Sequence, residues 1–117
     1  MSDNRITKLS QVLVNHSIKV KPKEKILITA YSYKALPLAK ECYKLCLTKG
    51  AFPKIDVAVD GLDYFFYTHA NKFQLEQPPD IALYLANWAD KFIRIAADVN
   101  DRELADVDPK KIMLRSK

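Results

Sequence analysis

The sequence predicts an α/β fold: a three-layer, Rossmann-like, mostly parallel sheet with helices on both faces. Three short runs rich in β-branched residues, 25–31, 53–59 and 91–97, have the length and composition of buried strands. Segments with helical periodicity separate these runs, and alternating strands and helices are typical of a parallel sheet. A chain of 117 residues fits one domain, which we expect to span 1–117.

The first two elements are an expected helix and an expected strand. Apolar residues between 6 and 14 recur at spacings close to those of an amphipathic helix. We expect this helix to fray near Ser17 and to end before Pro22. The first strand, KILITAY at 25–31, follows a charged turn.

The strongest helical signal covers residues 34–49. Its apolar residues form one stripe, made of Leu36, Ala39, Cys42, Tyr43, Cys46 and Leu47. Gly50 is expected as the C-cap, because glycine readily takes the left-handed conformation that ends many helices. The second strand follows at 53–59.

The remaining elements are short helices, a strand and a final helix. After a turn at Asp60 and Gly61, residues 65–79 are expected to form short helices, and Pro79 can begin a further one. The third strand follows at 91–97. A last helix after Asp108 is still running where the sequence stops, as in a truncated chain.

Composition and charge narrow the function classes. The formal net charge is +5, which permits an anionic partner, yet the interspersed lysines favour a solvated face. A nucleic-acid partner is not expected, since no arginine-rich helix or RNA-binding aromatic motif accompanies the charge. No apolar run approaches the ~20 residues that cross a bilayer, and the N-terminus lacks a signal-peptide core. We expect a cytoplasmic protein without a membrane partner.

The metal-ligating residue types do not form a recognisable metal motif. His16 and His69 are the only histidines, and no HExxH spacing exists. His16 is expected to be partly buried and structural. His69 and Glu76 are about two helical turns apart, too far for an i, i+4 ligand pair. Cys42 and Cys46 are expected to be small apolar core residues.

Other catalytic and binding motifs are absent as well. The chain has two glycines, so neither a GxGxxG motif nor a P-loop can be built. Residues 64–67, YFFY, are expected to lie in the core rather than to form a platform for stacked bases.

Polar residues follow two of the predicted strands. In open parallel sheets, ligands bind outside the carboxyl ends of the strands. Asp60 follows the second predicted strand, and Asp98 and Asn100 follow the third. We therefore predict Asp60, Asp98 and Asn100 at the rim of a substrate cavity. Each of them can instead serve as a helix cap, and this alternative stays open.

Four blocks of the sequence resemble one known family. The blocks are NRITKLSQVLVNHSIKVKPKEKILI at 4–28, KGAFP at 49–53, FYTHANKFQLEQPP at 66–79 and ADKFIRIAADVNDRELADVDPKKI at 89–112. In this order they resemble the start of the thermophilic-type metalloaminopeptidases, peptidase family M29. The chain departs from the family at Lys23, where glycine is usual, and at His16, where an aromatic residue is common.

The resemblance implies a longer enzyme. Members of the family are two-domain, dimeric exopeptidases that use two divalent metal ions (zinc, cobalt or manganese) to remove N-terminal residues from peptides. The family's metal ligands lie in the C-terminal domain, and none of those positions falls in this sequence. We therefore assign no catalytic and no metal-binding residue. The chain is expected to be the N-terminal, cavity-shaping domain, inactive alone, with the C-terminal catalytic domain and peptides as partners.

A free-standing, non-catalytic interaction module is the alternative. Its basic surface would bind an anionic partner. Otherwise, the face that would meet the absent domain would be apolar and would drive self-association, which makes a homodimer possible.

Overall fold

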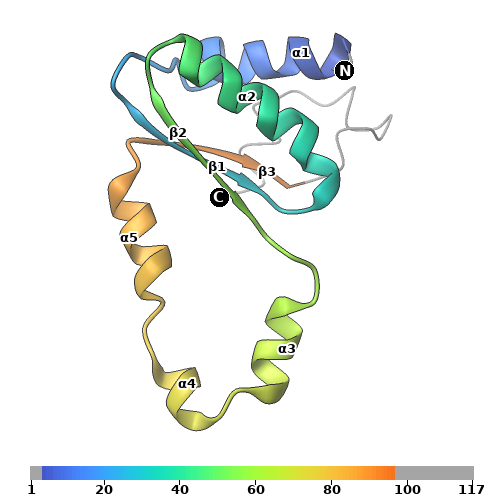
Figure 1. Cartoon of the computed structure of the whole chain (residues 1–117), viewed down its shortest axis with the longest axis vertical. Helices are drawn as coiled ribbons and strands as arrows, with labels where there is room; N and C mark the ends of the chain where they lie inside the picture. Colours follow the sequence, from blue (N-terminus) through green and yellow to red (C-terminus); the bar gives the residue numbers. More distant parts are fainter. Residues whose placement is uncertain (1–3, 97–117) are drawn as a thin grey trace.

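The computed structural model describes residues 4–96 (Figure 1). The elements, in chain order, are α1 (Asn4–Gln11), the π-helix η1 (Val12–Ser17), β1 (Lys25–Ala30), the 3-10 helix η2 (Tyr33–Ala35), α2 (Leu36–Thr48), β2 (Phe52–Val57), α3 (Leu62–His69), α4 (Lys72–Glu76), α5 (Asp80–Trp88) and β3 (Lys91–Ile95). The three strands pair in parallel in the order β2-β1-β3. The predicted α/β class with a parallel sheet is thus confirmed. The helix expected after Asp108 lies outside the described residues.

One face of the sheet carries the core. Ile26, Ile28 and Ala30 of β1 are fully buried, and the register sets Ile28 beside Ile93 of β3. These side chains share a face because successive residues of a strand alternate between faces. Residues of α1, η1 and α2 join the same cluster, among them Ile6, Leu13, Val14, Leu38, Ala39, Cys42 and Cys46. Full burial of a Leu or Ile side chain stabilises the fold by about 1.5–3 kcal/mol.

The buried stripe of α2 is narrower than the sequence predicts. Leu38, Ala39, Cys42 and Cys46 are fully buried, and both cysteines are free thiols, as expected. Tyr43 is 37% exposed and Leu47 53% exposed, so the expectation that the apolar stripe includes them is wrong. Both residues lie on the side of α2 that faces away from the sheet, next to the lysines of that helix.

Two tight connections fix the amino edge of the sheet. Lys23 has a left-handed backbone with φ +70°, and its N–H donates to the carbonyl of Gly50 at 2.8 Å. Gly50 itself has φ +79°, where glycine avoids the strain that a Cβ imposes. The C-cap residue of α2 is Lys49, one position before Gly50, the expected cap.

A long excursion, which we call the arm (residues 58–89), joins β2 to β3 and contains α3, α4 and α5. Figure 1 shows it beyond the sheet, on the side opposite α1 and α2. The helices of the arm bury no residue, so within residues 4–96 only one face of the sheet has a packed helical layer. The expectation of a core position for Tyr64, Phe65, Phe66 and Tyr67 is therefore wrong, since these side chains are 45–72% exposed.

Candidate functional site

The carboxyl edge of the sheet is the first place to look for a site. The N–H of Tyr31 donates to the carbonyl of Ile95 at 3.0 Å, and the N–H of Ala58 donates to the carbonyl of Ala30 at 2.8 Å. The ends of all three strands are thus held side by side. With the order β2-β1-β3, the chain reverses its direction across the sheet between β1 and β3. In doubly wound sheets this switch point is where ligands bind.

Aromatic side chains stand at this switch point. Ser32 has an extended backbone, and Tyr31 and Tyr33 on either side of it are 39% and 63% exposed. The N–H of Ala35 donates to the Ser32 carbonyl at 3.1 Å, which fixes the turn into α2. Tyr33 was not among the residues predicted from the sequence. Its position three residues after a buried strand was the available signal.

Asp60 lies in the turn that leads from β2 into the arm. The N–H of Leu62 donates to the Val59 carbonyl at 3.3 Å, and Gly61 between them has φ +89° and ψ −14°. This is the geometry of a type II turn, which requires φ > 0 at its third residue. Gly61 is the N-cap residue of α3 and no side chain caps the helix, so Asp60 does not act as the cap there. Its carboxylate is exposed beyond the carboxyl edge.

Only part of the predicted rim can be placed. Asp98 and Asn100 lie outside the described residues, and the grouping of Asp60 with them stays a prediction.

The metal-ligating residue types lie apart. His16 is exposed on η1, so the expected partial burial is wrong. His69 is exposed at the end of α3, where its Nδ1 lies 2.8 Å from the Thr68 hydroxyl and 3.1 Å from the Phe65 carbonyl. Between residues 4 and 96, no three His, Cys, Asp or Glu side chains gather closely enough to hold a metal ion. These residues do not fit a pair of divalent metals.

The two cysteines are poor ligands and poor nucleophiles in this setting. Burial raises the pKa of the Cys46 thiol to about 11. Burial also raises the pKa of Cys42, and the neighbouring Cys46 adds to this effect. The thiolate is the reactive and metal-binding form, so both residues serve as core side chains.

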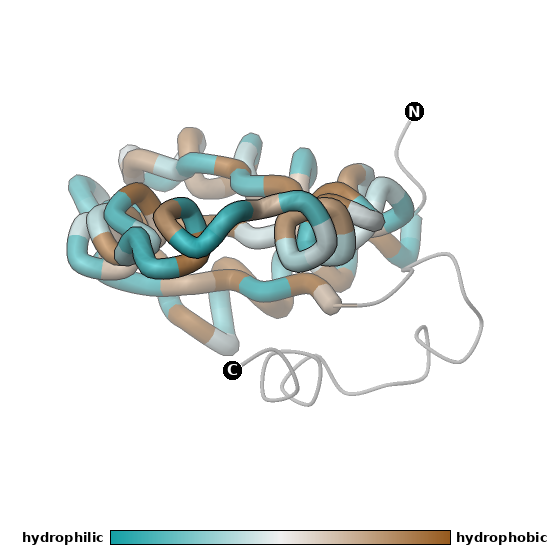
Figure 2. Tube along the Cα trace, turned by 90° about the horizontal axis from the view of Figure 1, so that it is seen from below, coloured by the Kyte–Doolittle hydropathy of each residue, from teal (hydrophilic) through white to brown (hydrophobic). Residues whose placement is uncertain are grey.

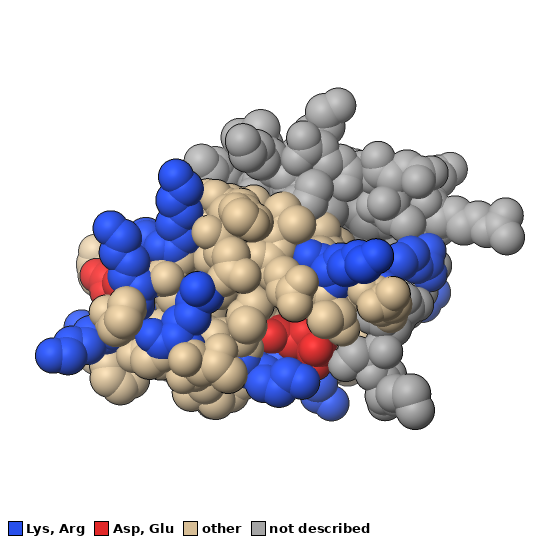
Figure 3. Space-filling model, turned by 90° about the horizontal axis from the view of Figure 1, so that it is seen from above, with Lys and Arg blue, Asp and Glu red and all other residues tan. Residues whose placement is uncertain are grey.

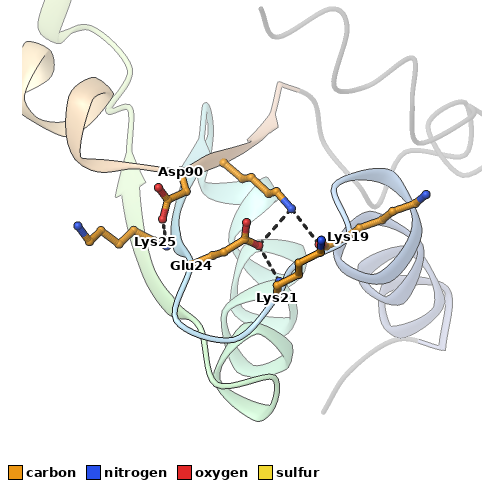
Figure 4. Close-up of polar contacts among 6 residues, drawn as sticks. Lys19, Lys21, Glu24, Lys25 and Asp90 are labelled. Carbon is orange, nitrogen blue, oxygen red and sulfur yellow. Dashed lines mark hydrogen bonds and ion pairs between the residues drawn. The ribbon is translucent and has the colours of Figure 1, made fainter.

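A cluster of charged residues lies at the opposite, amino edge of the sheet (Figure 4). The ammonium of Lys91 lies 3.1 Å from Glu24 Oε1 and donates to the Lys19 carbonyl at 2.9 Å. The backbone N–H of Lys21 donates to the same Glu24 oxygen at 2.6 Å. This hydrogen bond and the nearby Lys91 ammonium hold the pKa of Glu24 below its usual value.

A second pair of contacts completes the cluster. The N–H of Lys25 donates to Asp90 Oδ2 at 2.9 Å, and the N–H of Asp90 donates to the Lys25 carbonyl at 2.7 Å. We call this set of contacts the amino-edge clasp, made of Lys19, Lys21, Glu24, Lys25, Asp90 and Lys91. It fastens the end of the arm to the start of β1 and occupies the edge opposite the candidate ligand site. Its role is structural.

A protein-family model matches nearly the whole chain. The model of the family Peptidase_M29, thermophilic metalloprotease, matches residues 2–117. The chain belongs to the M29 family. No curated protein matches the chain at a significant level.

Membership of the M29 family places the chain among metallopeptidases. The M29 family implies the use of a metal, and residues 4–96 contain no group of His, Cys, Asp or Glu side chains that could hold one. Among the same residues, no helix could cross a bilayer: the longest, α2, has 13 residues, against the ~20 that a span requires.

Proposed function

We propose that this chain is the N-terminal, substrate-cavity-shaping domain of a metal-dependent aminopeptidase that removes N-terminal residues from peptides. The observation that carries the proposal is the M29 match over residues 2–117. The arrangement of the described residues supports it, since a sheet with an accessible carboxyl edge suits substrate binding. No metal-dependent step is derived from these residues, because their donor groups lie apart.

The proposed contribution of this chain is to bind and orient the peptide. An aminopeptidase substrate carries a positive ammonium at its N-terminus, and a carboxylate at the cavity rim complements that charge. Asp60 offers such a carboxylate, and Asp98 and Asn100 are proposed to join it. The partners in this function are the C-terminal catalytic domain and the peptide.

The proposal is tested first with the 117-residue chain itself. The pure chain is incubated with Zn²⁺, Co²⁺ or Mn²⁺ and assayed on leucine p-nitroanilide and on short peptides, with an active M29 enzyme as positive control. We expect no hydrolysis above that of the metal ions alone. Hydrolysis by the chain that a chelator abolishes would contradict the proposal that catalysis needs the C-terminal domain.

The domain role is tested by the coding DNA downstream of codon 117. An open frame that encodes a second domain with His and Glu residues supports the proposal, and a stop codon contradicts it. In such a longer protein, Asp60→Asn is expected to raise KM severalfold with little change in kcat. Asp56→Asn is the matched control, because Asp56 is also an exposed acid but lies within β2 and not in the turn that follows it. If the two variants have the same KM, Asp60 does not lie at the rim of the substrate cavity.

A further inference from the structure

The amino edge of the sheet gathers lysines from three separate parts of the chain. The N–H of Lys23 donates to the Gly50 carbonyl at 2.8 Å, which sets Lys49 beside the loop before β1. The Lys91 ammonium donates to the Lys19 carbonyl at 2.9 Å, which brings in the start of β3. The lysines that meet at this edge are Lys19, Lys21, Lys23, Lys25, Lys49 and Lys91.

The same gathering of positive charge is visible from outside. Figure 3 looks onto the end formed by α1 and α2, and basic side chains stand together on its left. On that side Figure 1 shows the starts of the three strands and the end of α2. The amino edge is therefore a basic surface of the molecule.

The acids of this edge leave most of its lysines unpaired. Glu24 accepts from the Lys21 backbone N–H at 2.6 Å and pairs with the Lys91 ammonium at 3.1 Å. Asp90 accepts from the Lys25 backbone N–H at 2.9 Å. Figure 4 shows the Lys25 side chain extending away from both carboxylates. The ammonium groups that pair with no carboxylate of residues 4–96 include those of Lys19, Lys21, Lys23 and Lys25.

The backbone holds this lysine loop in place. Lys19 and Lys23 have positive φ angles, +51° and +70°. Between them, Val20 is buried in the core, and its N–H donates to the Val14 carbonyl at 2.9 Å. A positive φ is unfavourable for lysine, so these contacts maintain the conformation of the loop. The ammonium groups extend from a fixed backbone, which lowers the cost of ordering the loop on binding.

An exposed aromatic side chain stands among the lysines. Phe52 begins β2 and is 57% exposed. The register sets Phe52 opposite Lys25, and Lys54 follows two residues later on the same face of β2. The N–H of Phe52 donates to the Glu24 carbonyl at 2.7 Å, which anchors it beside the lysine loop. A ligand at this edge can therefore bury an apolar group as well as pair its charges.

The charge distribution of the chain favours an anionic ligand at this edge. The arm has four acidic residues and one basic residue, whereas the other described residues have thirteen basic and four acidic ones. Figure 2, seen from the end where the arm lies, shows hydrophobic and hydrophilic residues interspersed along it. An acidic ligand is repelled by the arm and attracted by the amino edge.

The composition of the edge favours an acidic protein segment over a nucleic acid. The cations gathered here are lysines, which lack the planar fork with which arginine binds a phosphate. Phe52 offers one ring, whereas proteins that bind single-stranded nucleic acids stack successive bases on several aromatic side chains. Carboxylates require only point charges, and one apolar side chain of a peptide fits beside one ring.

We propose that the amino edge of the sheet is a docking surface for an acidic segment of another protein, in which an apolar residue lies among several Asp or Glu residues. The carboxylates of this segment pair with the lysine loop before β1, and its apolar side chain packs on Phe52. The surface lies at the edge opposite Tyr31 and Asp60, so a docked partner leaves the candidate ligand site open. This inference does not rest on the proposed peptidase role.

The first test is the binding of a labelled acidic peptide to the 117-residue chain. The probe is a fluorescein-labelled peptide with two leucines between two runs of four glutamates, and the control probe has glutamine in place of every glutamate. By fluorescence anisotropy in ~50 mM salt, we expect a Kd on the order of 10–100 μM for the acidic probe and at least about tenfold weaker binding of the control. In ~500 mM salt the Debye length is only ~4 Å, so the affinity for the acidic probe should fall at least about tenfold.

Charge reversal locates the site. Lys19→Glu/Lys25→Glu should raise the Kd of the acidic probe at least about tenfold, because like charges then face each other. The matched control is Lys40→Glu/Lys72→Glu, which makes the same change of net charge at exposed lysines of α2 and α4 and should leave the Kd within about threefold. Circular dichroism and the melting temperature of each variant establish that the fold is retained.

The apolar contact is tested separately. Phe52→Ala should raise the Kd about threefold or more at both salt concentrations, because the ring is lost while the charges stay. Phe73→Ala removes an exposed ring of the arm and should leave the Kd unchanged. Since Phe52→Ala keeps every lysine, it also tests the surface if the charge-reversed variant does not fold.

Three outcomes would overturn the proposal. The first is equal binding of the acidic and the glutamine probe. The second is an unchanged Kd in both Lys19→Glu/Lys25→Glu and Phe52→Ala. The third is a labelled oligouridine that binds more tightly than the acidic probe and is weakened by the same variants, because the surface would then be a nucleic-acid site.

Discussion

Replacement of Lys91 by methionine tests whether the amino-edge clasp stabilises the sheet. The substitution keeps most of the aliphatic stem but removes the ammonium that contacts Glu24 at 3.1 Å and the Lys19 carbonyl at 2.9 Å. The Lys91 and Glu24 side chains are 28% and 22% exposed, so the ion pair is screened only in part. An exposed pair contributes about 0.2–1 kcal/mol and a hydrogen bond about 0.5–1.5 kcal/mol. We expect the free energy of unfolding to fall by about 1–2 kcal/mol.

Urea denaturation followed by circular dichroism at pH 7 measures this loss, which corresponds to a decrease in melting temperature of several degrees. Lys72→Met is the matched control, because Lys72 is an exposed lysine of the arm and its removal should cost less than about 0.5 kcal/mol. If the two variants are equally stable within about 0.3 kcal/mol, the clasp contributes nothing and the reasoning is wrong.

The pH dependence gives a second check on the same contact. The folded-state pKa of Glu24 lies below 4.5, so its contribution is complete above that pH and is lost as the pH falls through the folded-state value. Removal of Lys91 takes away one cause of the lowered pKa. The stability of Lys91→Met should therefore fall less steeply than that of the wild type on acidification below pH 4.5. An unchanged slope would show that Lys91 does not act on the Glu24 carboxylate.

Three further results follow from the backbone and the core. Lys23→Gly should raise the free energy of unfolding by up to about 1 kcal/mol, since relief of a left-handed residue outweighs the added freedom of the unfolded chain; a loss in urea denaturation would contradict this. Cys42 and Cys46 should react with Ellman's reagent at pH 8 only as fast as the chain opens, and immediate labelling of the native protein would refute the burial argument. Ile28→Ala should cost about 2–5 kcal/mol, while Tyr84→Ala should stay within about 0.5 kcal/mol in dilute solution; comparable losses by thermal melting would contradict the placement of the core.

The sequence predicted the strands well because their pattern is local. Each run of β-branched residues became a strand within two residues of its expected bounds, and the helix after β1 begins where Pro37 takes its first turn. The parallel pairing followed from the alternation of elements. Local composition and spacing carry these features, so no tertiary information was needed.

The position of the arm could not be predicted in the same way. The pattern YFFY at 64–67 shows that the segment is apolar but not which surface covers it. Burial depends on partners far away in the sequence or on another molecule, and neither is encoded in local periodicity. The prediction for Tyr43 and Leu47 was wrong for the same reason. A helical stripe shows which residues share a face of α2, but not how much of that face the sheet covers.

The candidate site was predicted only as an edge of the sheet. The rule that ligands bind at the carboxyl ends led to Asp60, since it needs only strand positions and direction. The left-handed backbone at Lys23 was not foreseen, although the glycine usual there in the M29 family was a signal. A positive φ can be predicted from the sequence where glycine occupies the position. Lysine rarely takes a positive φ, so its presence at position 23 gave no such indication.

The arm has a consequence for how the chain tolerates being cut. Both of its ends are held in the sheet, one by the pairing of β1 with β2 and the other by the amino-edge clasp, while its own helices contribute no buried residue. A protease that cleaves after an exposed aromatic residue of α3 would leave two fragments, one with β1 and β2 and the other with β3. Because β3 still pairs along the whole of its length with β1, the fragments should stay together and refold together, so that the arm marks a natural position for dividing the domain into two complementing pieces.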